Sequence, residues 1–324
     1  MKQTRRQFVR TLFVASQAVV ASRFVATNLM ADTSPLAASQ DGLNFLVFGD
    51  WGRRGEQDQL EVAEQMSRVA RASNARFIIS VGDNFYEDGV KSVDDPHWQK
   101  SFEQVYRDPA MHVPWYCILG NHDYHWGGSC DAQIDYHRIS PRWNMPARYY
   151  QQTHQVDAQT TADFFYLDTP PIIQSYYSVF EGFKTRQNVM TQDVPKQLAW
   201  FKSALAASTA RWKIVIAHHP IYSGGGHGDS PDLIQNILPL LHEHKVQAYF
   251  NGHDHDLQHL VAGEINLFDS GAGSQHNPTS YTRHSKFAKS CSGFTTVSLQ
   301  ADKMDLRMID NKGRQVYGTT VARG

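Results

Sequence analysis

The chain has 324 residues, with 31 lysines and arginines against 32 aspartates and glutamates, and 19% of its residues are charged. The hydrophobic share of 41% is typical of an ordered globular protein, and the length suits one large domain or two ordinary ones. The 22 glycines and 13 prolines follow no fixed period and no tract is of low complexity, which excludes collagen-like, coiled-coil and disordered classes.

Positive charge is concentrated at the start of the chain. Residues 1–31 contain five basic residues and no acidic one: Lys2, Arg5, Arg6, Arg10 and Arg23. Without these five charges the net charge of the chain falls from -1 to -6. Nucleic acids and anionic membranes are bound mainly through clustered lysine and arginine, so we expect neither as a partner.

The first segment, residues 1–31, is predicted to be a twin-arginine signal peptide. The pair Arg5 and Arg6 precedes a weakly apolar stretch over residues 12–30, and small residues follow it. This stretch is too polar for a stable transmembrane helix, and an ordinary basic helix is the alternative interpretation. We therefore expect the twin-arginine machinery to export the protein to the periplasm or the exterior, with residues 32–43 as a short linker.

Short β-rich runs alternate with helical segments along the rest of the chain. Strands are predicted over residues 44–48, 77–81, 116–119, 164–167, 214–217, 248–250 and 266–268. Helices are predicted over residues 57–72, 195–207 and 230–244. Residues 293–321 are expected to add antiparallel strands around a turn at residues 311–313. Alternating strands and helices predict a single α/β domain over residues 44–324, whose oligomeric state the sequence leaves open.

Polar clusters directly follow five of the predicted strands. They are Asp50–Gly52, Gly82–Tyr86, Gly120–Asp123, His218–Pro220 and Gly252–His255. Loops at the carboxyl ends of strands in an open α/β sheet converge on one crevice. Each cluster alone would be an ordinary turn, but together they supply oxygen and nitrogen ligands suited to iron, zinc or manganese. Two metals need about seven protein ligands if one carboxylate bridges them, and Asp83 is available as that bridge.

These clusters resemble the motifs of the purple acid phosphatases, which belong to the calcineurin-like metallophosphoesterases. The five motifs occur in order as Asp50-x-Gly52, Gly82-Asp83-x-x-Tyr86, Gly120-Asn121-His122-Asp123, Val215-x-x-His218 and Gly252-His253-x-His255. The resemblance spans residues 44–321 and is greatest to the small tartrate-resistant type. It implies a β-sandwich of two mixed sheets flanked by helices, in αββα layers.

The resemblance also implies roles for the motif residues. Asp50, Tyr86 and His255 would hold Fe(III), Asn121, His218 and His253 would hold a second divalent metal (Fe, Zn or Mn), and Asp83 would bridge both. A hard phenolate favours Fe(III), which lowers the pKa of bound water enough to supply hydroxide in acid. The implied reaction is hydrolysis of small-molecule phosphomonoesters by in-line attack of metal-bound hydroxide.

Two histidines are implied to be catalytic. By resemblance, His122 contacts phosphate and helps to protonate the leaving alkoxide, and His227 lies where small family members place a second catalytic histidine. Because residues 223–226 before it are Ser-Gly-Gly-Gly, His227 could instead be a solvated loop residue. Gly226 stands where small animal members carry an acidic residue, so their pH tuning is in doubt here.

Two other functions remain open. A phosphodiesterase or nucleotide pyrophosphatase could use the same metal site, although Tyr86 favours the purple subgroup because related diesterases generally lack that ligand. A redox-active di-iron protein is the other alternative, and His122 and His227 argue against it because a storage site has no use for a proton donor. His219, beside His218, is expected to be pocket wall or ligand support rather than a metal ligand.

Overall fold

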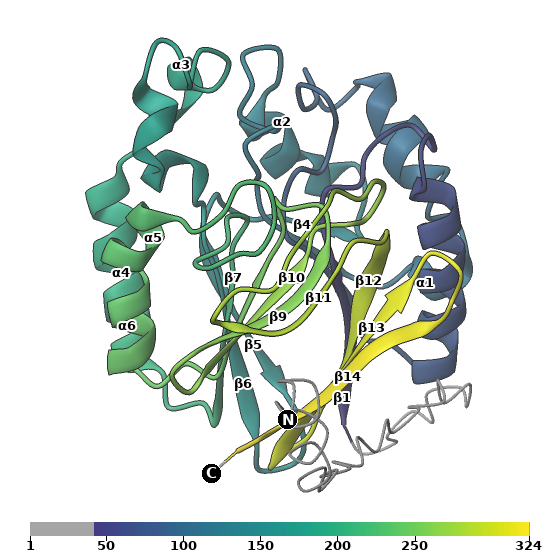
Figure 1. The fold of residues 1–324 in the computed structure, drawn as a ribbon. Coiled ribbons are helices and arrows are strands. Elements are labelled where there is room, and N and C mark those ends of the chain that lie inside the picture. The colour runs from purple at the N-terminus through teal and green to yellow at the C-terminus, as the bar shows by residue number, and fades with distance from the viewer. Residues whose placement is uncertain (1–41, 324) are drawn as a thin grey trace, which may run out of the picture. The chain divides into compact units, whose positions relative to one another are not determined.

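The computed structural model describes residues 42–323. In this part of the chain two seven-stranded sheets pack face to face, and helices lie on their outer faces (Figure 1). This arrangement confirms the predicted αββα sandwich with mixed sheets. The predicted signal peptide and most of the predicted linker lie outside the described residues.

The first sheet, sheet A, has the strand order β14-β13-β12-β1-β2-β3-β4. Its strands are β1 Leu43–Phe48, β2 Phe77–Ser80, β3 Trp115–Cys117, β4 Trp143–Asn144, β12 Gly293–Leu299, β13 Lys303–Asp310 and β14 Gln315–Ala322. Strands β1 to β4 are parallel to one another, whereas β12 pairs antiparallel with β1, and β13 and β14 continue antiparallel. The predicted antiparallel tail is therefore confirmed.

The second sheet, sheet B, has the strand order β11-β9-β10-β8-β7-β6-β5. Its strands are β5 Tyr150–Gln155, β6 Thr161–Tyr166, β7 Trp212–Ile216, β8 Ala248–Asn251, β9 Leu257–Ala262, β10 Ile265–Ser270 and β11 Ser285–Lys289. Strands β6, β7, β8 and β10 are parallel, and β5, β9 and β11 are antiparallel to their neighbours. The sequence did not predict these three antiparallel strands.

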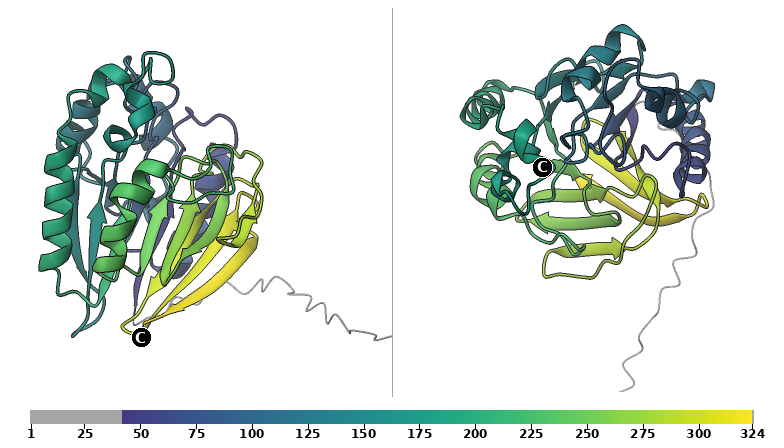
Figure 2. Two further views of the ribbon diagram at one scale, coloured as in Figure 1. Left: turned by 60° about the vertical axis from the view of Figure 1, so that its left-hand side comes forward. Right: turned by 90° about the horizontal axis from the view of Figure 1, so that it is seen from above.

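Six α-helices lie around the sheets in the described residues. They are α1 Gln59–Ser73, α2 Cys130–Asp135, α3 Arg186–Val189, α4 Val194–Ala207, α5 Pro231–Asn236 and α6 Leu238–Glu243. Helix α1 lies beside β1 and β12 on sheet A, while α4, α5 and α6 cover the outer face of sheet B (Figure 2). None of the helices in residues 42–323 is long and apolar enough to cross a membrane.

The core has two layers because side chains alternate along the central strands of sheet B. One set packs between the sheets with Phe45 and Phe77 and comprises Phe164, Ile214 and Phe250. The other set packs beneath the helices with Phe201 of α4 and comprises Phe165, Val215 and Tyr249. Strands buried on both faces are apolar almost throughout, which made them recognisable in the sequence.

The predicted helix over residues 230–244 is wrong in one respect, because it is two helices. Helix α5 ends at Asn236, and α6 starts at Leu238 with Pro239 in its first turn. Proline has no backbone N–H and its ring clashes with the carbonyl four residues earlier, so a continuous helix cannot pass through Pro239. The other two predicted helices are present as α1 and α4.

Candidate metal centre and catalytic site

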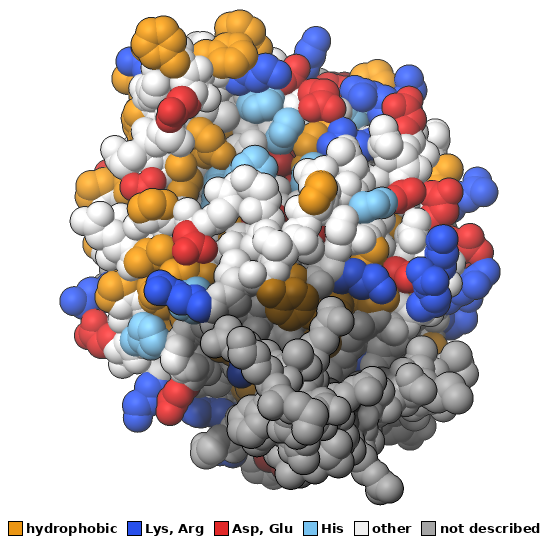
Figure 3. Space-filling view, in the orientation of Figure 1, with side chains coloured by type: hydrophobic (Ala, Val, Ile, Leu, Met, Phe, Trp, Pro, Cys, Tyr) orange, Lys and Arg blue, Asp and Glu red, His pale blue; other side chains and the backbone are white. Residues whose placement is uncertain are grey.

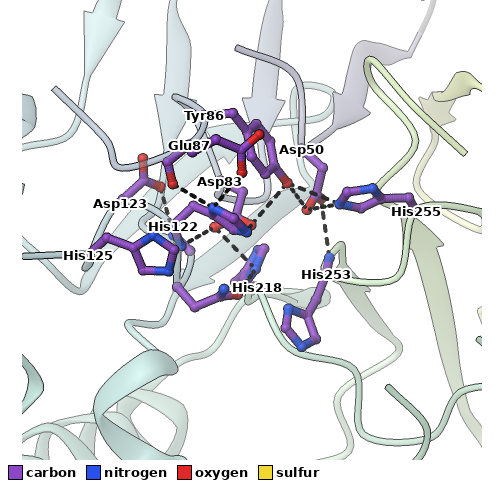
Figure 4. Close-up of polar contacts among 12 residues, drawn as sticks. Asp50, Asp83, Tyr86, Glu87, His122, Asp123, His125, His218, His253 and His255 are labelled. Atoms are coloured by element: carbon purple, nitrogen blue, oxygen red, sulfur yellow. Dashed lines mark hydrogen bonds and ion pairs between the residues drawn. The ribbon is translucent and has the colours of Figure 1, made fainter. Parts of the chain in front are cut away.

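The five predicted polar clusters meet at one end of the sandwich. The clusters at residues 50–52, 82–86 and 120–123 follow β1, β2 and β3 of sheet A, and those at 218–220 and 252–255 follow β7 and β8 of sheet B. Figure 4 shows side chains from these clusters pointing toward one another, among them those of Asp50, Asp83, Tyr86, His218 and His255. Histidine side chains also gather on the upper part of the face in Figure 3.

Four side chains form an oxygen-rich cluster around the hydroxyl of Tyr86. This hydroxyl lies 2.9 Å from Asp50 Oδ1, 3.0 Å from Asp83 Oδ2 and 3.0 Å from His255 Nε2. His255 Nε2 is also 3.4 Å from Asp50 Oδ1. The structure therefore brings together the residues predicted for the iron site, with Asp83 beside them.

Three further side chains form a nitrogen-rich cluster next to the first. His218 Nε2 lies 3.0 Å from Asn121 Oδ1, and the rings of His218 and His253 have centroids 5.1 Å apart. The His218 Nδ1–H donates to the Val81 carbonyl at 2.9 Å, which leaves Nε2 free to act as a ligand. The residues predicted to hold the second metal therefore also lie together.

Asp83 lies between the two clusters, and each of its oxygens faces a different one. Oδ2 faces Tyr86, while Oδ1 lies 3.5 Å from His218 Nε2. Burial would raise the pKa of Asp83, but the adjacent His218 and His122 hold this pKa well below its usual range. The carboxylate is therefore ionised and oriented as a bridge between two cations would be.

The loops adopt unusual backbone conformations at three predicted ligands. Asp50, Asp83 and His253 have positive φ angles of 61°, 48° and 75°. Such conformations are uncommon for residues other than glycine and occur most often at functional sites. Close packing accompanies them: a Cβ atom on Gly120 would lie 2.1 Å from Asp83 Oδ1, so only glycine fits beside this carboxylate.

The residues of both clusters fit metal ions. Asp50 and Asp83 are buried, and among the described residues no lysine or arginine forms an ion pair with either carboxylate. Burial raises the pKa of Tyr86, and the charges of the two carboxylates raise it further, so a phenolate here requires a strong cation beside it. Buried carboxylates are stabilised by pairing or by metal coordination, and the donor set suits iron, zinc or manganese.

His122 lies at the edge of the oxygen-rich cluster. Its backbone N–H donates to Asp83 Oδ1 at 2.8 Å, and its ring centroid is 4.4 Å from that of Tyr86. The contact of its Nδ1 with the Glu87 carbonyl, at 2.6 Å, requires a proton on Nδ1 because a carbonyl only accepts. Its Nε2 remains on the side of the site, 4.0 Å from Asp83 Oδ2.

His227 lies at the edge of the nitrogen-rich cluster, and its loop is tied to the segment that carries the ligands. Its ring centroid is 3.9 Å from that of His253, and its backbone N–H donates to Asp254 Oδ1 at 3.0 Å. The backbone of Gly224 donates to Gln258 Oε1 at 2.8 Å. A Cβ atom on Gly225 would lie 2.3 Å from Asp254 Cγ, so the loop approaches this carboxyl group more closely than another residue would allow.

Sequence reasoning missed the supporting carboxylates Asp123 and Asp254. Asp123 is buried and accepts the backbone N–H groups of Gly120 and Asn84, at 2.9 Å and 3.1 Å, so it joins two ligand loops. Burial and the charge of Asp83 raise the pKa of Asp123 to about 7. Both aspartates occur inside the motifs, and their position among the ligands was the available signal.

His219 lies beside the nitrogen-rich cluster, but its two ring nitrogens have other partners. The nitrogens of His218, His219 and His253 lie within 4.8 Å of one another, a spacing that could hold a metal. However, both nitrogens of His219 contact hydroxyl groups, Nδ1 that of Thr169 and Nε2 that of Tyr176, each at 2.9 Å. This geometry agrees with the predicted role of His219 as pocket wall or support.

Comparison with known proteins places this site among phosphoesterases. The model of the calcineurin-like phosphoesterase family matches residues 43–257. Purple acid phosphatase 4 of Arabidopsis thaliana is 35% identical over 298 residues, which cover 87% of this chain and 84% of that protein. Tartrate-resistant acid phosphatase type 5 of Rattus norvegicus is 34% identical over 302 residues, with coverage of 87% and 90%.

Solved structures share the fold. GAP50, described as the anchor in the inner membrane complex of Plasmodium, superposes with a TM-score of 0.76 and 26% identity, covering 88% of this chain and 90% of that one. The purple acid phosphatase PPD1 from yellow lupin (Lupinus luteus) seeds gives a TM-score of 0.63 at 14% identity, covering 87% of this chain and 54% of that one. At so low an identity the lupin match shows the fold alone.

Proposed function

Because this chain belongs to the calcineurin-like phosphoesterase family and is a binuclear-metal acid phosphatase of the purple, tartrate-resistant type, we propose that it hydrolyses small-molecule phosphomonoesters at the two clusters. The observation that carries the proposal is the position of Asp83, which presents one oxygen to each cluster. When bound, two metal ions supply an activated water and withdraw charge from the phosphoryl group.

We assign the proton-donor role to His122. Its Nδ1–H is held by the Glu87 carbonyl, so the ring is fixed with Nε2 toward the site. As an imidazolium, the ring carries a second proton on Nε2, which it donates to the oxygen of the leaving group. A leaving group that departs as an alcohol avoids building up the charge of an alkoxide.

We assign His227 to the opposite side of the substrate. It lines a cleft of about 380 Å³ together with His219 and His253, and the bond from its backbone to Asp254 fixes where it lies. As an imidazolium, its side chain complements the negative charge of a phosphate ester. The two histidines thus act from the two clusters on one ester.

Fe(III) is proposed for the oxygen-rich cluster and a divalent iron, zinc or manganese ion for the nitrogen-rich cluster. The support is chemical, since hard carboxylate and phenolate ligands prefer the more highly charged cation. Replacing Tyr86 with Phe should abolish the violet absorption expected of an iron phenolate in the purified protein. Unchanged colour in this variant would show that the ligand assignment is wrong.

Export by the twin-arginine machinery to the periplasm or exterior remains a proposal that rests on residues 1–31 alone, which lie outside the described residues. A test is to replace Arg5 and Arg6 with lysines, which keeps the positive charge. Phosphatase activity should then remain in the cytoplasmic fraction of a host with this machinery. Unchanged export of the variant would contradict the proposal.

The proposed reaction is tested by measuring the hydrolysis of an aryl phosphomonoester and the matching diester at pH 5 and pH 7.5. We expect the monoester to be hydrolysed faster than the diester. We also expect its hydrolysis to be faster at pH 5 than at pH 7.5. The Asp83→Ala variant, purified in parallel, controls for contaminating phosphatases. Preference for the diester would overturn the substrate assignment, and no turnover with two metals bound would favour the redox alternative.

A further inference from the structure

A tyrosine outside the motifs enters the cleft beside the nitrogen-rich cluster. Tyr176 lies in a short 3₁₀ helix, Gln174–Tyr177, and lines the cleft with His219, His227 and His253. Nothing in its local sequence indicates a function. Its hydroxyl has one hydrogen-bond partner among the described residues, which is His219 Nε2 at 2.9 Å.

The hydrogen atoms around His219 can be assigned from their partners. The hydroxyl of the buried Thr169 accepts the backbone N–H of His219 at 3.3 Å, and its own hydrogen has one acceptor among the described residues, His219 Nδ1 at 2.9 Å. If Nδ1 carried the proton instead, this buried hydroxyl hydrogen would have no acceptor, which is costly. The proton of the neutral imidazole therefore lies on Nε2.

This tautomer determines what the tyrosine can do. The Nε2–H of His219 donates to the Tyr176 oxygen, so the hydrogen of the Tyr176 hydroxyl has no acceptor among residues 42–323. The side chain of Tyr176 is only partly buried and faces the cleft, so this hydrogen is available to a ligand there.

We propose that Tyr176 is a substrate-binding residue, whose O–H donates a hydrogen bond to a phosphoryl oxygen of the bound ester, with His219 and Thr169 as positioning residues. The inference rests on the proposed phosphatase function and names a contact that the motifs do not contain. A pre-oriented donor at a partly buried position stabilises the charge that the phosphoryl group carries in the transition state.

The surroundings of Tyr176 agree with this role. The ring centroid of His219 is 4.4 Å from that of His253, so the Tyr176 hydroxyl is one side chain away from a predicted metal ligand. Burial and the charge of Asp83 raise the pKa of Tyr176 well above its usual range, which keeps the hydroxyl protonated. The donor is therefore present at every pH at which the enzyme would work.

The cleft also has room for more than phosphate. Its volume of about 380 Å³ falls within the range of small-molecule sites, and Ile173, Pro220 and Pro231 give it an apolar wall. Tyr176 lines the same cleft as this wall and the predicted metal ligand His253. The hydroxyl therefore lies in a cleft that has room for both the phosphoryl group of an ester and its leaving group.

The decisive variant is Tyr176→Phe, which removes only the hydroxyl. We expect kcat/KM for an aryl phosphomonoester to fall about tenfold to a hundredfold, the range for losing a hydrogen bond to a charged group. The dissociation constant of inorganic phosphate, measured by calorimetry on the metal-loaded protein, should rise in parallel. Metal content and the absorption spectrum should not change.

Tyr177→Phe is the matched control. The neighbouring Tyr177 donates its hydroxyl to the Pro171 carbonyl at 2.8 Å, away from the cleft, so this variant should bind phosphate and turn over ester as the wild type does. If Tyr176→Phe matches this control in phosphate affinity, the inference is overturned. Loss of metal or of the spectrum in Tyr176→Phe would also overturn it, since the role would then be structural.

A second pair of variants tests the positioning residues. Thr169→Val removes the hydroxyl that sets the tautomer of His219 and should reproduce part of the Tyr176→Phe defect, whereas Thr169→Ser should restore wild-type values. In the double variant Thr169→Val/Tyr176→Phe the two losses should not add. Full additivity would show that Thr169 does not act through Tyr176.

Inactive wild-type protein would contradict the proposed function, whereas active wild type with a normal Tyr176→Phe variant would contradict only this inference. The dissociation constant of inorganic phosphate, measured by calorimetry, tests the role of Tyr176 in either case.

Discussion

The oxygen-rich and nitrogen-rich clusters share Asp83 but have opposite electrostatics. Burial alone would lower the pKa of His255. A hydrogen bond with Asp50 and the charges of Asp50 and Asp83 outweigh burial, so the pKa of His255 is raised. Burial and the neighbouring histidines lower the pKa of His253 well below its usual range. One cluster therefore concentrates negative charge and the other presents the neutral imidazole of His253, so the cation of higher charge fits the first.

The clusters also differ in how they draw on the two sheets. Loops of sheet A supply all of the predicted oxygen ligands, and loops of sheet B supply all of the predicted histidine ligands. Each proposed metal has ligands from both sheets, with His255 completing the oxygen-rich cluster and Asn121 completing the nitrogen-rich one. Bound metals would thus connect the sheets at the end where strand pairing stops.

Loss of Asp83 should have the largest effect, because it removes the group that joins the clusters. Residues that merely support a metal ligand contribute about tenfold to a hundredfold to affinity or activity, so Asp83→Ala should lower kcat/KM by more than about a hundredfold. It should also reduce the content of both metals, measured by elemental analysis. Asp131→Ala at the exposed surface is the control, and an Asp83→Ala protein with two metals per chain would refute the bridge.

The second-largest effect is expected for the histidines beside the two clusters, and it distinguishes their roles. His122→Ala should slow alkyl phosphates by about a hundredfold or more, the contribution of a general acid, and activated aryl phosphates much less. His227→Ala should slow both classes alike, because a residue that complements phosphate charge acts on every ester. The comparison is made in kcat/KM at pH 5, and equal losses in His122→Ala would exclude its role as the acid.

The central parallel strands could be predicted from the sequence because they are buried on both faces and are apolar almost throughout, as in residues 44–48 of β1. Strand β9 is also buried but was not predicted, because Gln258 and His259 interrupt its apolar run. The edge strands β5 and β11 could not be predicted in this way. An edge strand has a neighbouring strand on one side only, and its residues are largely polar, as in Tyr150–Gln155 of β5. The break at Pro239 could have been predicted, because a proline inside a helical pattern ends or kinks the helix at the preceding residue.

The predicted ligands lay close to strand ends, so motif spacing and topology were enough to group them. Tyr176 could not be found in this way, because its contact with His219 joins residues 43 apart and depends on how the segment before α4 packs. Such long-range contacts have no local sequence signal.

A smaller effect should appear in the unfolding of the metal-free protein. The raised pKa of His255 means that its protonation stabilises the folded state below about pH 6.5 and that this contribution is lost as the pH rises. The lowered pKa of His253 has the opposite sign, since below about pH 6.5 the unfolded chain binds a proton that the folded state excludes.

His255→Asn should therefore destabilise the metal-free protein more at pH 5 than at pH 8. His253→Asn should show the opposite dependence and destabilise the protein less at pH 5 than at pH 8. Urea unfolding of both variants and the wild type at the two pH values measures this. The same pH response in both variants would contradict the electrostatic difference between the clusters.

The smallest effect concerns Gly226, beside His227. A Cβ atom there would meet no atom within 4 Å, and its φ is not positive, so a side chain is tolerated. Gly226→Glu places a carboxylate beside the exposed imidazole of His227, and at low salt this negative charge favours the imidazolium. Because the imidazolium is the form that complements phosphate, the alkaline limb of the kcat/KM profile should move to higher pH. Gly226→Gln should leave the limb in place, and added salt should abolish the shift, since exposed charges are screened. A shift common to both variants would instead trace to the shape of the loop and would remove His227 from the groups that set the pH dependence.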